Sequence, residues 1–234
     1  MVSKNVIAFS LWGDKSTYLK GAVINAKDAQ LFYPDFECWF YIHSESVPVE
    51  TVLELSSLPN VKIIYRTGDL TTVKPMMWRF IAIDDPEVTI MMSRDTDTRI
   101  LQREKVAVDE WLNSEYPFHI MRDHPYHDTP ILGGMFGVKK IPEIPSWKTL
   151  VDSYIQQGHR DYDQTFLREV IYPIVKDSAM IHATFYRIEN ERCRHFTVPY
   201  DDEYRFVGEY IDHDGSRNNH QINALKSAYH ASLR

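Results

Sequence analysis

The sequence predicts an α/β protein with a mostly parallel central sheet, helices on its flanks and a less regular C-terminal third. Two observations support this prediction. In the first hundred residues, short apolar segments alternate with segments of helical periodicity, which is typical of parallel strands joined by crossover helices. Several of the apolar segments are also apolar throughout, as expected for strands that are buried on both faces.

The elements of the first half follow one another closely. Strands are expected in the apolar runs at 6–11, 37–42, 61–65 and 88–93. Helices are expected between them, where apolar residues recur at helical spacing, at 18–29, 49–58 and 76–83. Ser16 is available to cap the first of these helices. The third ends at Asp84-Asp85-Pro86, because proline disfavours helical backbone angles in the residue before it.

The second half remains α/β but is less regular. It is expected to contain a helix at 101–112, a strand at 118–121, a loop at 122–130, a strand at 131–138, helices at 146–157 and 162–174, and a strand at 179–184. From Arg187 onward the chain is polar and rich in loops. No repeat and no interdomain linker is visible, so residues 1–234 are expected to form a single domain.

Charge and composition exclude several classes of function. The 26 Lys and Arg residues are outnumbered by 33 Asp and Glu, and the formal charge of −7 argues against nonspecific nucleic-acid binding. No apolar stretch approaches the length of a membrane span, and the start at 6–12 resembles a strand and turn more than a signal peptide. Cys38 and Cys193 lie far apart, so two free thiols are expected. These features predict a soluble, cytoplasmic protein and leave its oligomeric state open.

Asp95 and Asp97 follow directly after the apolar run at 88–93 and are the strongest functional signal. A parallel strand delivers its C-terminal residues to the edge of the sheet at which open α/β sheets bind ligands. Two acids at such an edge are costly unless a cation or a donor compensates them. Carboxylate oxygens suit Mg²⁺ or Mn²⁺, which in turn suit phosphate groups. The pair therefore predicts a metal-bridged diphosphate site.

Two other interpretations of this acid pair stay open. In a phosphatase, the first carboxylate would attack phosphate and the second would act as acid and base. That pair usually lies on the first strand, however, and no lysine or acidic-loop partner is evident downstream. In a purely structural interpretation, Asp97 or Thr98 would cap the helix that follows.

The segment 74–99, which contains Asp95-Thr96-Asp97, resembles the centre of a GT-A-type glycosyltransferase. The segments 118–125, 131–137 and 162–167 fit the acceptor half of such enzymes. The overall order is similar to the small glycosyltransferase domains of large algal DNA viruses and their bacterial relatives, over about residues 5 to 185. The resemblance implies a nucleotide-sugar-binding half at about 1–100, an acceptor half at about 101–185 and a C-terminal extension at 186–234.

The resemblance implies that Asp95 and Asp97 contact a Mn²⁺ or Mg²⁺ cofactor and the nucleotide of the donor. Phe9, Ser10 and Leu11, at the end of the first strand, would line the base pocket. The expected donor is a nucleoside-diphosphate sugar, with UDP preferred and GDP as the alternative.

Two arginines and two glycines complete the expected donor side. Arg79 would donate paired hydrogen bonds to phosphate or base, its alternative being a surface ion pair with Asp84 or another acid. Arg94 would pair with Asp95 or with a phosphate. Gly133 and Gly134 would let the donor sugar lie against the backbone, unless they mark a bulge or a tight bend.

The polar segment after residue 122 is expected to bind the acceptor, a glycan or glycoconjugate. Asp123, His124 and His127 would donate and accept hydrogen bonds with sugar hydroxyls. Together with His119 these residues could also suggest a zinc hydrolase, although their spacing matches no strong zinc signature. A solvated loop without a binding role is the third interpretation.

Asp163, at the start of a predicted helix, is the candidate catalytic acid on the acceptor side. A carboxylate there could take the proton of the acceptor hydroxyl as the bond to the sugar forms. The alternative is that Asp161 or Asp163 only caps the helix. Metals in the resembling fold often take a further ligand from the C-terminal half, for which His182 or His213 is a candidate.

Three functions therefore compete. The first is transfer of a sugar from a nucleoside-diphosphate sugar to a hydroxyl acceptor. The second is a phosphoryl-transfer enzyme, either a phosphatase or a nucleotidyltransferase, that uses the same acids. The third is a noncatalytic glycan-binding module. The donor sugar, the acceptor and the stereochemical course do not follow from the sequence.

Overall fold

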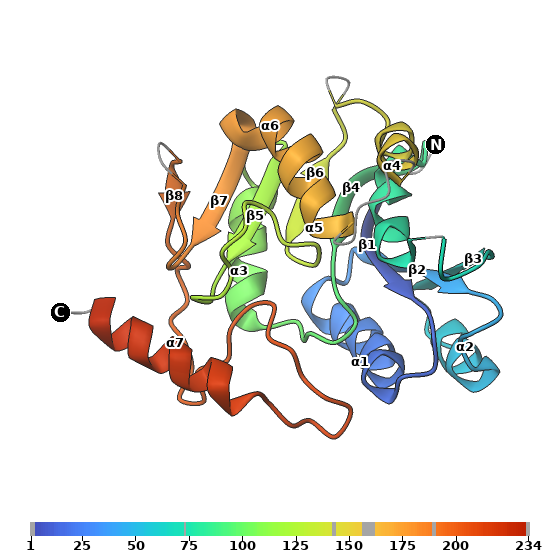
Figure 1. Cartoon of the computed structure of the whole chain (residues 1–234), viewed down its shortest axis with the longest axis horizontal. Helices are drawn as coiled ribbons and strands as arrows, with labels where there is room; N and C mark the ends of the chain where they lie inside the picture. The colour runs from blue at the N-terminus through green and yellow to red at the C-terminus, as the bar shows by residue number, and fades with distance from the viewer. Residues whose placement is uncertain (1–2, 73, 142–143, 156–161, 189–190, 233–234) are drawn as a thin grey trace.

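The computed structural model describes residues 3–72, 74–141, 144–155, 162–188 and 191–232. In this part of the chain, one eight-stranded sheet runs across the molecule in the order β3-β2-β1-β4-β6-β5-β7-β8 (Figure 1). All neighbouring strands are parallel except β6, which is antiparallel to both β4 and β5. The mostly parallel sheet expected from the sequence is confirmed. The strands are β1 (Lys4–Leu11), β2 (Phe36–His43), β3 (Val61–Arg66), β4 (Val88–Ser93), β5 (Phe118–Arg122), β6 (Phe136–Lys139), β7 (Ala179–Ala183) and β8 (Cys193–Arg194).

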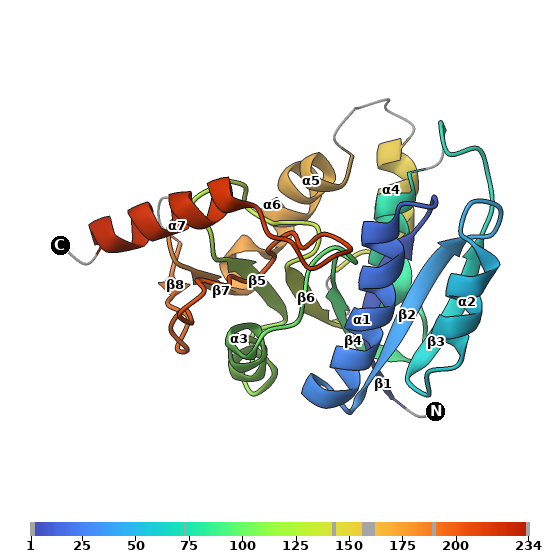
Figure 2. The same cartoon turned by 90° about the horizontal axis from the view of Figure 1, so that it is seen from below.

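Helices cover both faces of the sheet (Figure 2). One face carries α1 (Ser16–Phe32), α2 (Val49–Ser56) and α3 (Gln102–Leu112). The other carries the 3-10 helix η1 (Pro75–Asp84), α4 (Trp147–Ile155), α5 (Tyr162–Phe166), the π-helical turn η2 (Leu167–Ile171) and α6 (Tyr172–Val175). The short η3 (Lys176–Ser178) connects α6 to β7. A last helix, α7 (Asn219–Ser232), belongs to the C-terminal extension.

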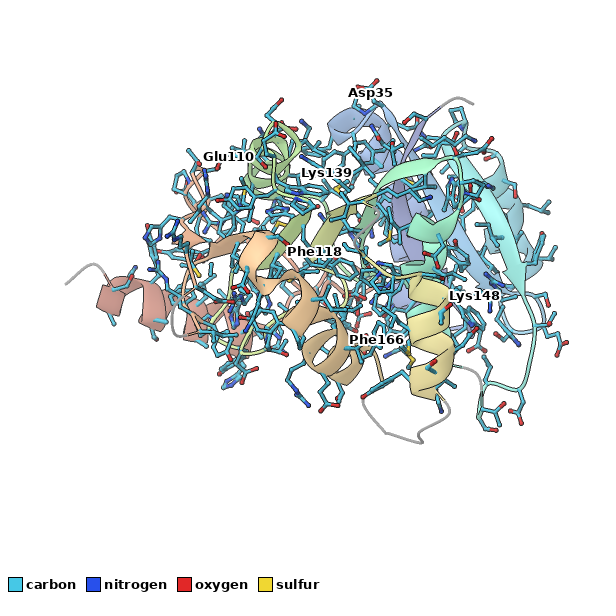
Figure 3. All side chains as sticks on the ribbon, turned by 90° about the horizontal axis from the view of Figure 1, so that it is seen from above. Asp35, Glu110, Phe118, Lys139, Lys148 and Phe166 are labelled. Atoms are coloured by element: carbon cyan, nitrogen blue, oxygen red, sulfur yellow. The ribbon has the colours of Figure 1, made fainter. Side chains whose placement is uncertain are left out.

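Small and aromatic residues shape the two layers. On α1, the alanines at 22, 26 and 29 are fully buried, so this helix can lie close to the sheet. On the opposite face, the rings of Phe118, Phe136 and Trp147 stack nearly in parallel, and Phe80 stacks on Phe166 at 6.2 Å. Figure 3 shows Phe118 and Phe166 within the mass of side chains between sheet and helices. The contacts of Phe166 with these rings fix the position of α5 relative to the sheet. Helix α5 contributes one residue to the candidate site that is described in the next subsection.

Several expected elements differ from the structure. The segment 76–83 is a 3-10 helix, and the strand expected at 131–138 begins only at Phe136 and runs to Lys139. The helix expected at 162–174 is interrupted by a π-helical turn just before Pro173, whose missing N–H interrupts the regular bonding pattern. The polar C-terminal extension contains α7 and, at its start, β8, neither of which was expected.

The sheet runs without interruption across the expected division at about residue 100, and that division remains a prediction. Cys38 and Cys193 are free thiols, as expected. Within the described ranges, no helix is both long and apolar enough to cross a membrane.

Candidate functional site

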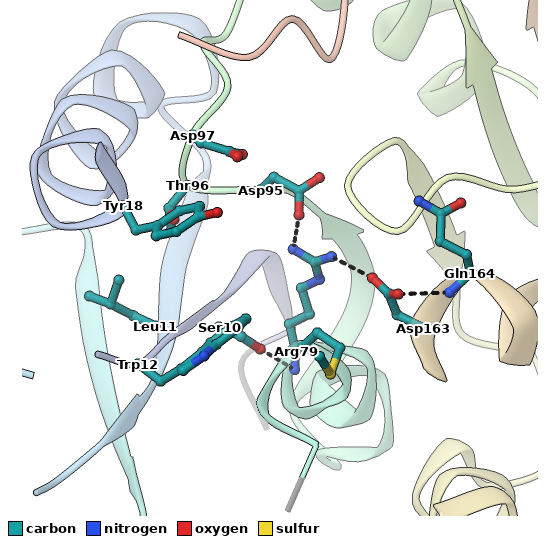
Figure 4. Close-up of a pocket in the computed structure, with 11 residues that line it drawn as sticks. Ser10, Leu11, Trp12, Tyr18, Arg79, Asp95, Thr96, Asp97, Asp163 and Gln164 are labelled. Atoms are coloured by element: carbon teal, nitrogen blue, oxygen red, sulfur yellow. Dashed lines mark hydrogen bonds and ion pairs between the residues drawn. The ribbon is translucent and has the colours of Figure 1, made fainter. Parts of the chain in front are cut away.

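A cavity of about 270 Å³ lies at the C-terminal edge of the sheet, beside the ends of β1 and β4 (Figure 4). The parallel register aligns Ala8 of β1 with Ser93 of β4, so the residues that follow each strand meet at this edge. The lining residues are Ser10, Leu11, Trp12, Tyr18, Met76, Arg79, Asp95, Thr96, Asp97, Asp163 and Gln164. Open α/β sheets bind their ligands at the carboxyl ends of the strands, and this cavity has that position.

Arg79 lies at the centre of the site and is only 4% exposed. Its Nη1 donates hydrogen bonds to Asp95 Oδ1 at 2.5 Å and to the carbonyl of Arg94 at 2.8 Å. Its Nη2 lies 3.8 Å from Asp163 Oδ2, and its backbone N–H donates to Ser10 Oγ (Figure 4). The guanidinium therefore joins the acid after β4 to the acid on α5. The surface ion pair considered for Arg79 is not formed.

Burial and mutual repulsion act on the carboxyls of the cavity. Burial, together with the neighbouring carboxylate of Asp95, raises the pKa of Asp97 to about 6. Burial also raises the pKa of Asp163, although Arg79 opposes this shift. The pKa of the Tyr18 hydroxyl is raised by burial and by Asp97. The cavity thus concentrates negative charge that a cation would stabilise.

Gly133 and Gly134 lie against these charged side chains. A Cβ on Gly134 would come within 2.1 Å of Asp95 Oδ2, and one on Gly133 within 2.8 Å of both Arg79 Nη2 and Asp163 Oδ2. Ser93 Oγ donates to the carbonyl of Gly133 at 2.6 Å and fixes this loop to the end of β4. The two glycines leave room for the acids and the arginine, a reason that differs from the sugar contact expected from the sequence.

The residues present fit a divalent cation of the Mg²⁺ or Mn²⁺ type. Asp95 and Asp97 both line the cavity, and burial beside the Asp95 carboxylate disfavours the charged form of Asp97, which a bound cation would favour. In the described residues, no group of three or more His, Cys, Asp or Glu side chains could hold a metal. Mg²⁺ is commonly held by one or two carboxylates, with water and phosphate oxygens as its other ligands. Two carboxylates are therefore a sufficient protein contribution.

Two donor-side expectations are corrected by the structure. Phe9 does not line the cavity, because strand alternation turns its fully buried ring into the core, where it stacks on Phe40 at 4.7 Å. Arg94 is also buried and pairs with Glu104 at 2.7 Å instead of with Asp95 or a ligand. Its Nη1 donates to the carbonyl of Phe136, so Arg94 ties β4, β6 and α3 together.

The acceptor-side expectation for Asp123, His124 and His127 is corrected as well, since all three are buried and each is hydrogen-bonded inside the protein. Asp123 accepts two hydrogen bonds from Arg103, at 2.7 and 2.8 Å. His124 Nε2 donates to the carbonyl of Gln221, and His127 Nδ1 accepts from the backbone of Asp123. The C-terminal extension packs against these three residues, whereas Tyr126 and Asp128 of the same loop remain exposed.

The two candidate histidine ligands differ in position. His182 is fully buried, with Nδ1 bonded to His119 and Nε2 to Glu110, so it has no free nitrogen for a metal. His213 is largely exposed and lies on the segment that reaches the acid pair, because the N–H of Ile211 donates to the carbonyl of Asp97 at 2.8 Å. His213 does not line the cavity in this conformation.

Neither a protein-family model nor a curated protein matches the sequence, but solved structures share its fold. A glycosyltransferase involved in the glycosylation of the major capsid of PBCV-1 aligns over 77% of this chain and 81% of its own, with a TM-score of 0.50 and 14% identity. Galactosyltransferase LgtC with donor and acceptor sugar analogs aligns over 76% and 73%, with a TM-score of 0.51 and 10% identity. An active-site mutant of LgtC aligns over 95% of both chains, with a TM-score of 0.50 and 10% identity. The chain has a GT-A fold.

Several cavity residues of this GT-A fold were missed by the sequence analysis: Trp12, Tyr18, Met76, Thr96 and Gln164. Trp12 follows β1 directly, and Tyr18 lies in the first turn of the next helix. Both positions are at the ligand-binding edge of a parallel sheet, which is the signal that could have predicted them. Met76 lies one helical turn before Arg79, and Gln164 directly follows Asp163, so closeness in sequence to two expected site residues was the signal available for them.

Proposed function

We propose that this protein transfers a sugar from a nucleoside-diphosphate sugar to a hydroxyl group of a glycan or glycoconjugate acceptor. The observation that carries the proposal is the convergence of Asp95, Asp97 and Asp163 on one cavity, with Arg79 between them. Such a site can bind a diphosphate on one side and a hydroxyl on the other. The glycosyltransferases that share the fold support the same function.

On the donor side, Asp95 and Asp97 would hold Mn²⁺ or Mg²⁺, with water and phosphate oxygens as the other ligands. The bound cation supplies positive charge next to the leaving nucleoside diphosphate. Arg79 keeps the Asp95 carboxylate in place. Leu11, Trp12 and Tyr18 offer apolar and aromatic surface for the base, for which we propose uracil in preference to guanine.

On the acceptor side, Asp163 would take the proton of the acceptor hydroxyl while the oxygen bonds to the sugar and the bond from sugar to phosphate breaks. Its raised pKa makes Asp163 a stronger base than an ordinary aspartate, and Arg79 keeps it in the carboxylate form. A phosphatase is less well supported, because Asp95 Oδ1 is bonded to Arg79 and is a weaker nucleophile for it.

Calorimetry with UDP, GDP and ADP, each with Mn²⁺ and with EDTA, tests this proposal. We expect UDP to bind most tightly and only with the metal, and nucleotide-sugar hydrolysis to need the metal as well. Release of phosphate from simple phosphomonoesters would instead support a phosphatase. Pyrophosphate-dependent turnover of a nucleotide sugar would support a nucleotidyltransferase. Glycan binding without metal-dependent nucleotide affinity would support a binding module.

The acid pair gives a sharper version of the same test. We expect Asp95→Asn and Asp97→Asn each to lower turnover on the order of 10²-fold or more, since each removes charge at the site of the departing diphosphate. Asp35→Asn is the matched control, because Asp35 is exposed at the start of β2, at the opposite edge of the sheet (Figure 3). Folded variants of Asp95 and Asp97 with the activity of the Asp35 variant would rule the proposal out.

A further inference from the structure

The turn that carries Asp95 and Asp97 is bonded to the middle of helix α1 by one side chain. Asn25 is 1% exposed, and its Nδ2 donates hydrogen bonds to the carbonyls of Thr98 at 2.9 Å and Thr96 at 3.2 Å. The carbonyl of Asp95 lies at 3.5 Å, the limit of a hydrogen bond. An amide nitrogen has two hydrogens, so the bonds to Thr96 and Thr98 are the main ones.

Gly21, one helical turn before Asn25, brings the backbone of the turn onto the helix. A Cβ at position 21 would lie 1.9 Å from the carbonyl oxygen of Thr96, which is closer than two atoms can approach. Gly21 and Asn25 are four residues apart and face the same way on α1. The turn therefore rests directly on this face of the helix, and only glycine leaves the necessary room at position 21.

The carbonyls of Thr96 and Thr98 face α1, whereas the carbonyl of Asp97 accepts the N–H of Ile211 from the C-terminal extension. This alternation fixes the peptide planes on both sides of Asp97, and with them the direction in which its side chain leaves the backbone. The turn needs such a restraint. Asp95 and Asp97 are like charges in a partly buried site, so repulsion favours their separation.

We propose that Asn25 is a positioning residue of the sugar-transfer site: its amide holds the 95–98 turn so that the carboxylates of Asp95 and Asp97 project together into the cavity. Asn25 touches neither substrate nor metal and acts through the backbone of the turn. Because the inference rests on the proposed function, its test must separate loss of positioning from absence of a nucleotide site.

Calorimetry with UDP and Mn²⁺ on three variants provides this separation. Asn25→Ala removes the two hydrogen bonds, and Gly21→Ala displaces Thr96 from the other side. Asn60→Ala is the matched control, because Asn60 donates a hydrogen bond of 2.9 Å to the carbonyl of Ala26 on the same helix but does not line the cavity. We expect Asn25→Ala and Gly21→Ala to weaken Mn²⁺-dependent UDP binding at least tenfold. Asn60→Ala is expected to lower the melting temperature but to change affinity less than twofold.

Each outcome is decisive. If wild-type protein binds none of UDP, GDP and ADP with Mn²⁺, the proposed function fails; if it binds GDP instead of UDP, the variants are compared with GDP. If wild-type protein binds but the Asn25 variant matches the Asn60 variant in affinity, the positioning role fails. If Asn25→Ala does not fold, Asn25→Ser, which retains one donor, replaces it and is expected to show intermediate affinity. Failure of both to fold would show that the amide maintains the fold and would overturn the inference.

Discussion

Asp97 carries a charge that the folded, metal-free protein disfavours. Its pKa of about 6 lies above the ordinary value of 3.8, because the carboxyl is buried beside Asp95. Between about pH 4 and pH 6 the folded state therefore binds more protons at this group than the unfolded state. Because the folded state binds more protons, the contribution of Asp97 to the free energy of unfolding falls as the pH rises through that window.

We expect Asp97→Asn to stabilise the metal-free protein at pH 7, by up to about 3 kcal/mol. The difference in free energy of unfolding between the variant and wild type should grow from pH 4 to about pH 6 and then level off. Urea titrations of both proteins in EDTA across this range measure it, and the difference cancels the titration of all other groups. A gap that is the same at pH 4 and pH 7 would contradict the raised pKa.

Asp163 allows a similar separation of catalysis from structure. Asparagine keeps the shape of the side chain and can still accept the hydrogen bond that Asp163 Oδ1 receives from the N–H of Gln164. It removes the negative charge that a base requires. We expect Asp163→Asn to lower kcat about 10²-fold or more, to change UDP affinity little, and to leave the melting temperature equal or higher.

The decisive measurement for Asp163 is kcat together with the melting temperature. Removal of a partly buried carboxylate whose pKa is raised should not destabilise the fold. A variant with unchanged kcat would assign Asp163 to helix capping alone, since asparagine is itself a good cap. Loss of UDP affinity in step with kcat would place Asp163 on the donor side.

At the scale of elements, the sequence was sufficient to predict the strands that consist of an unbroken run of apolar residues. The apolar runs of β1 and β4 predicted buried parallel strands. In the structure, Ser10, Leu11, Asp95 and Asp97 lie at the C-terminal ends of these two strands and line one cavity. The structure also places Arg79, expected on the donor side, and Asp163, expected on the acceptor side, in this one cavity, and it shows a 3-10 helix at η1 that was not foreseen. Strand direction and strand end follow from local patterns, so this part of the site was predictable.

The loop after β5 was misjudged because its partners are remote in sequence. Asp123 and His124 are polar, which favours a solvated loop, yet both are buried. Arg103 from α3 and Tyr200 from the extension satisfy the Asp123 carboxylate, 20 and 77 residues away. Spacing along the chain cannot reveal such pairing, because the local sequence around an acid does not show whether a distant residue pairs with it.

Helix α7 was missed for a different reason, because its sequence lacks apolar periodicity. Leu225 is its one buried side chain among the described residues of this helix, so no hydrophobic stripe marks it. A local signal was nevertheless present: Asn218 Oδ1 accepts hydrogen bonds from the N–H groups of His220 and Gln221, as an N-cap residue does. Capping residues carry more information than hydrophobicity in helices that lie on the surface.

At the scale of the whole molecule, the C-terminal extension contacts the candidate site at Asp97 and the loop after β5 at Asp123. Ile211 bonds to Asp97, and Asp212 accepts a hydrogen bond from Thr17 on α1. Farther along the sheet, Tyr200 and the N–H of Val207 donate to the carboxylate of Asp123 at 2.9 and 3.0 Å. The extension therefore links the expected nucleotide-binding half to the expected acceptor half.

Asp123 is the residue at which this linkage can be tested. Its buried carboxylate pairs with Arg103 at 2.7 Å, and its loss would leave that guanidinium buried without a counter-charge. We expect Asp123→Ala to lower the free energy of unfolding by about 3–5 kcal/mol. Glu203→Ala, in the C-terminal extension, is the matched control, because its ion pair with Arg205 is exposed and should contribute about 1 kcal/mol or less.

Urea unfolding followed by circular dichroism and by tryptophan fluorescence measures both variants. Because the extension bonds to both halves, we expect one transition at the same urea concentration with either probe, shifted strongly for Asp123→Ala and little for Glu203→Ala. Two separate transitions would show that the extension or one half unfolds alone, which would contradict the single domain expected from the sequence. A wild-type midpoint for Asp123→Ala would show that the buried ion pair does not stabilise this linkage.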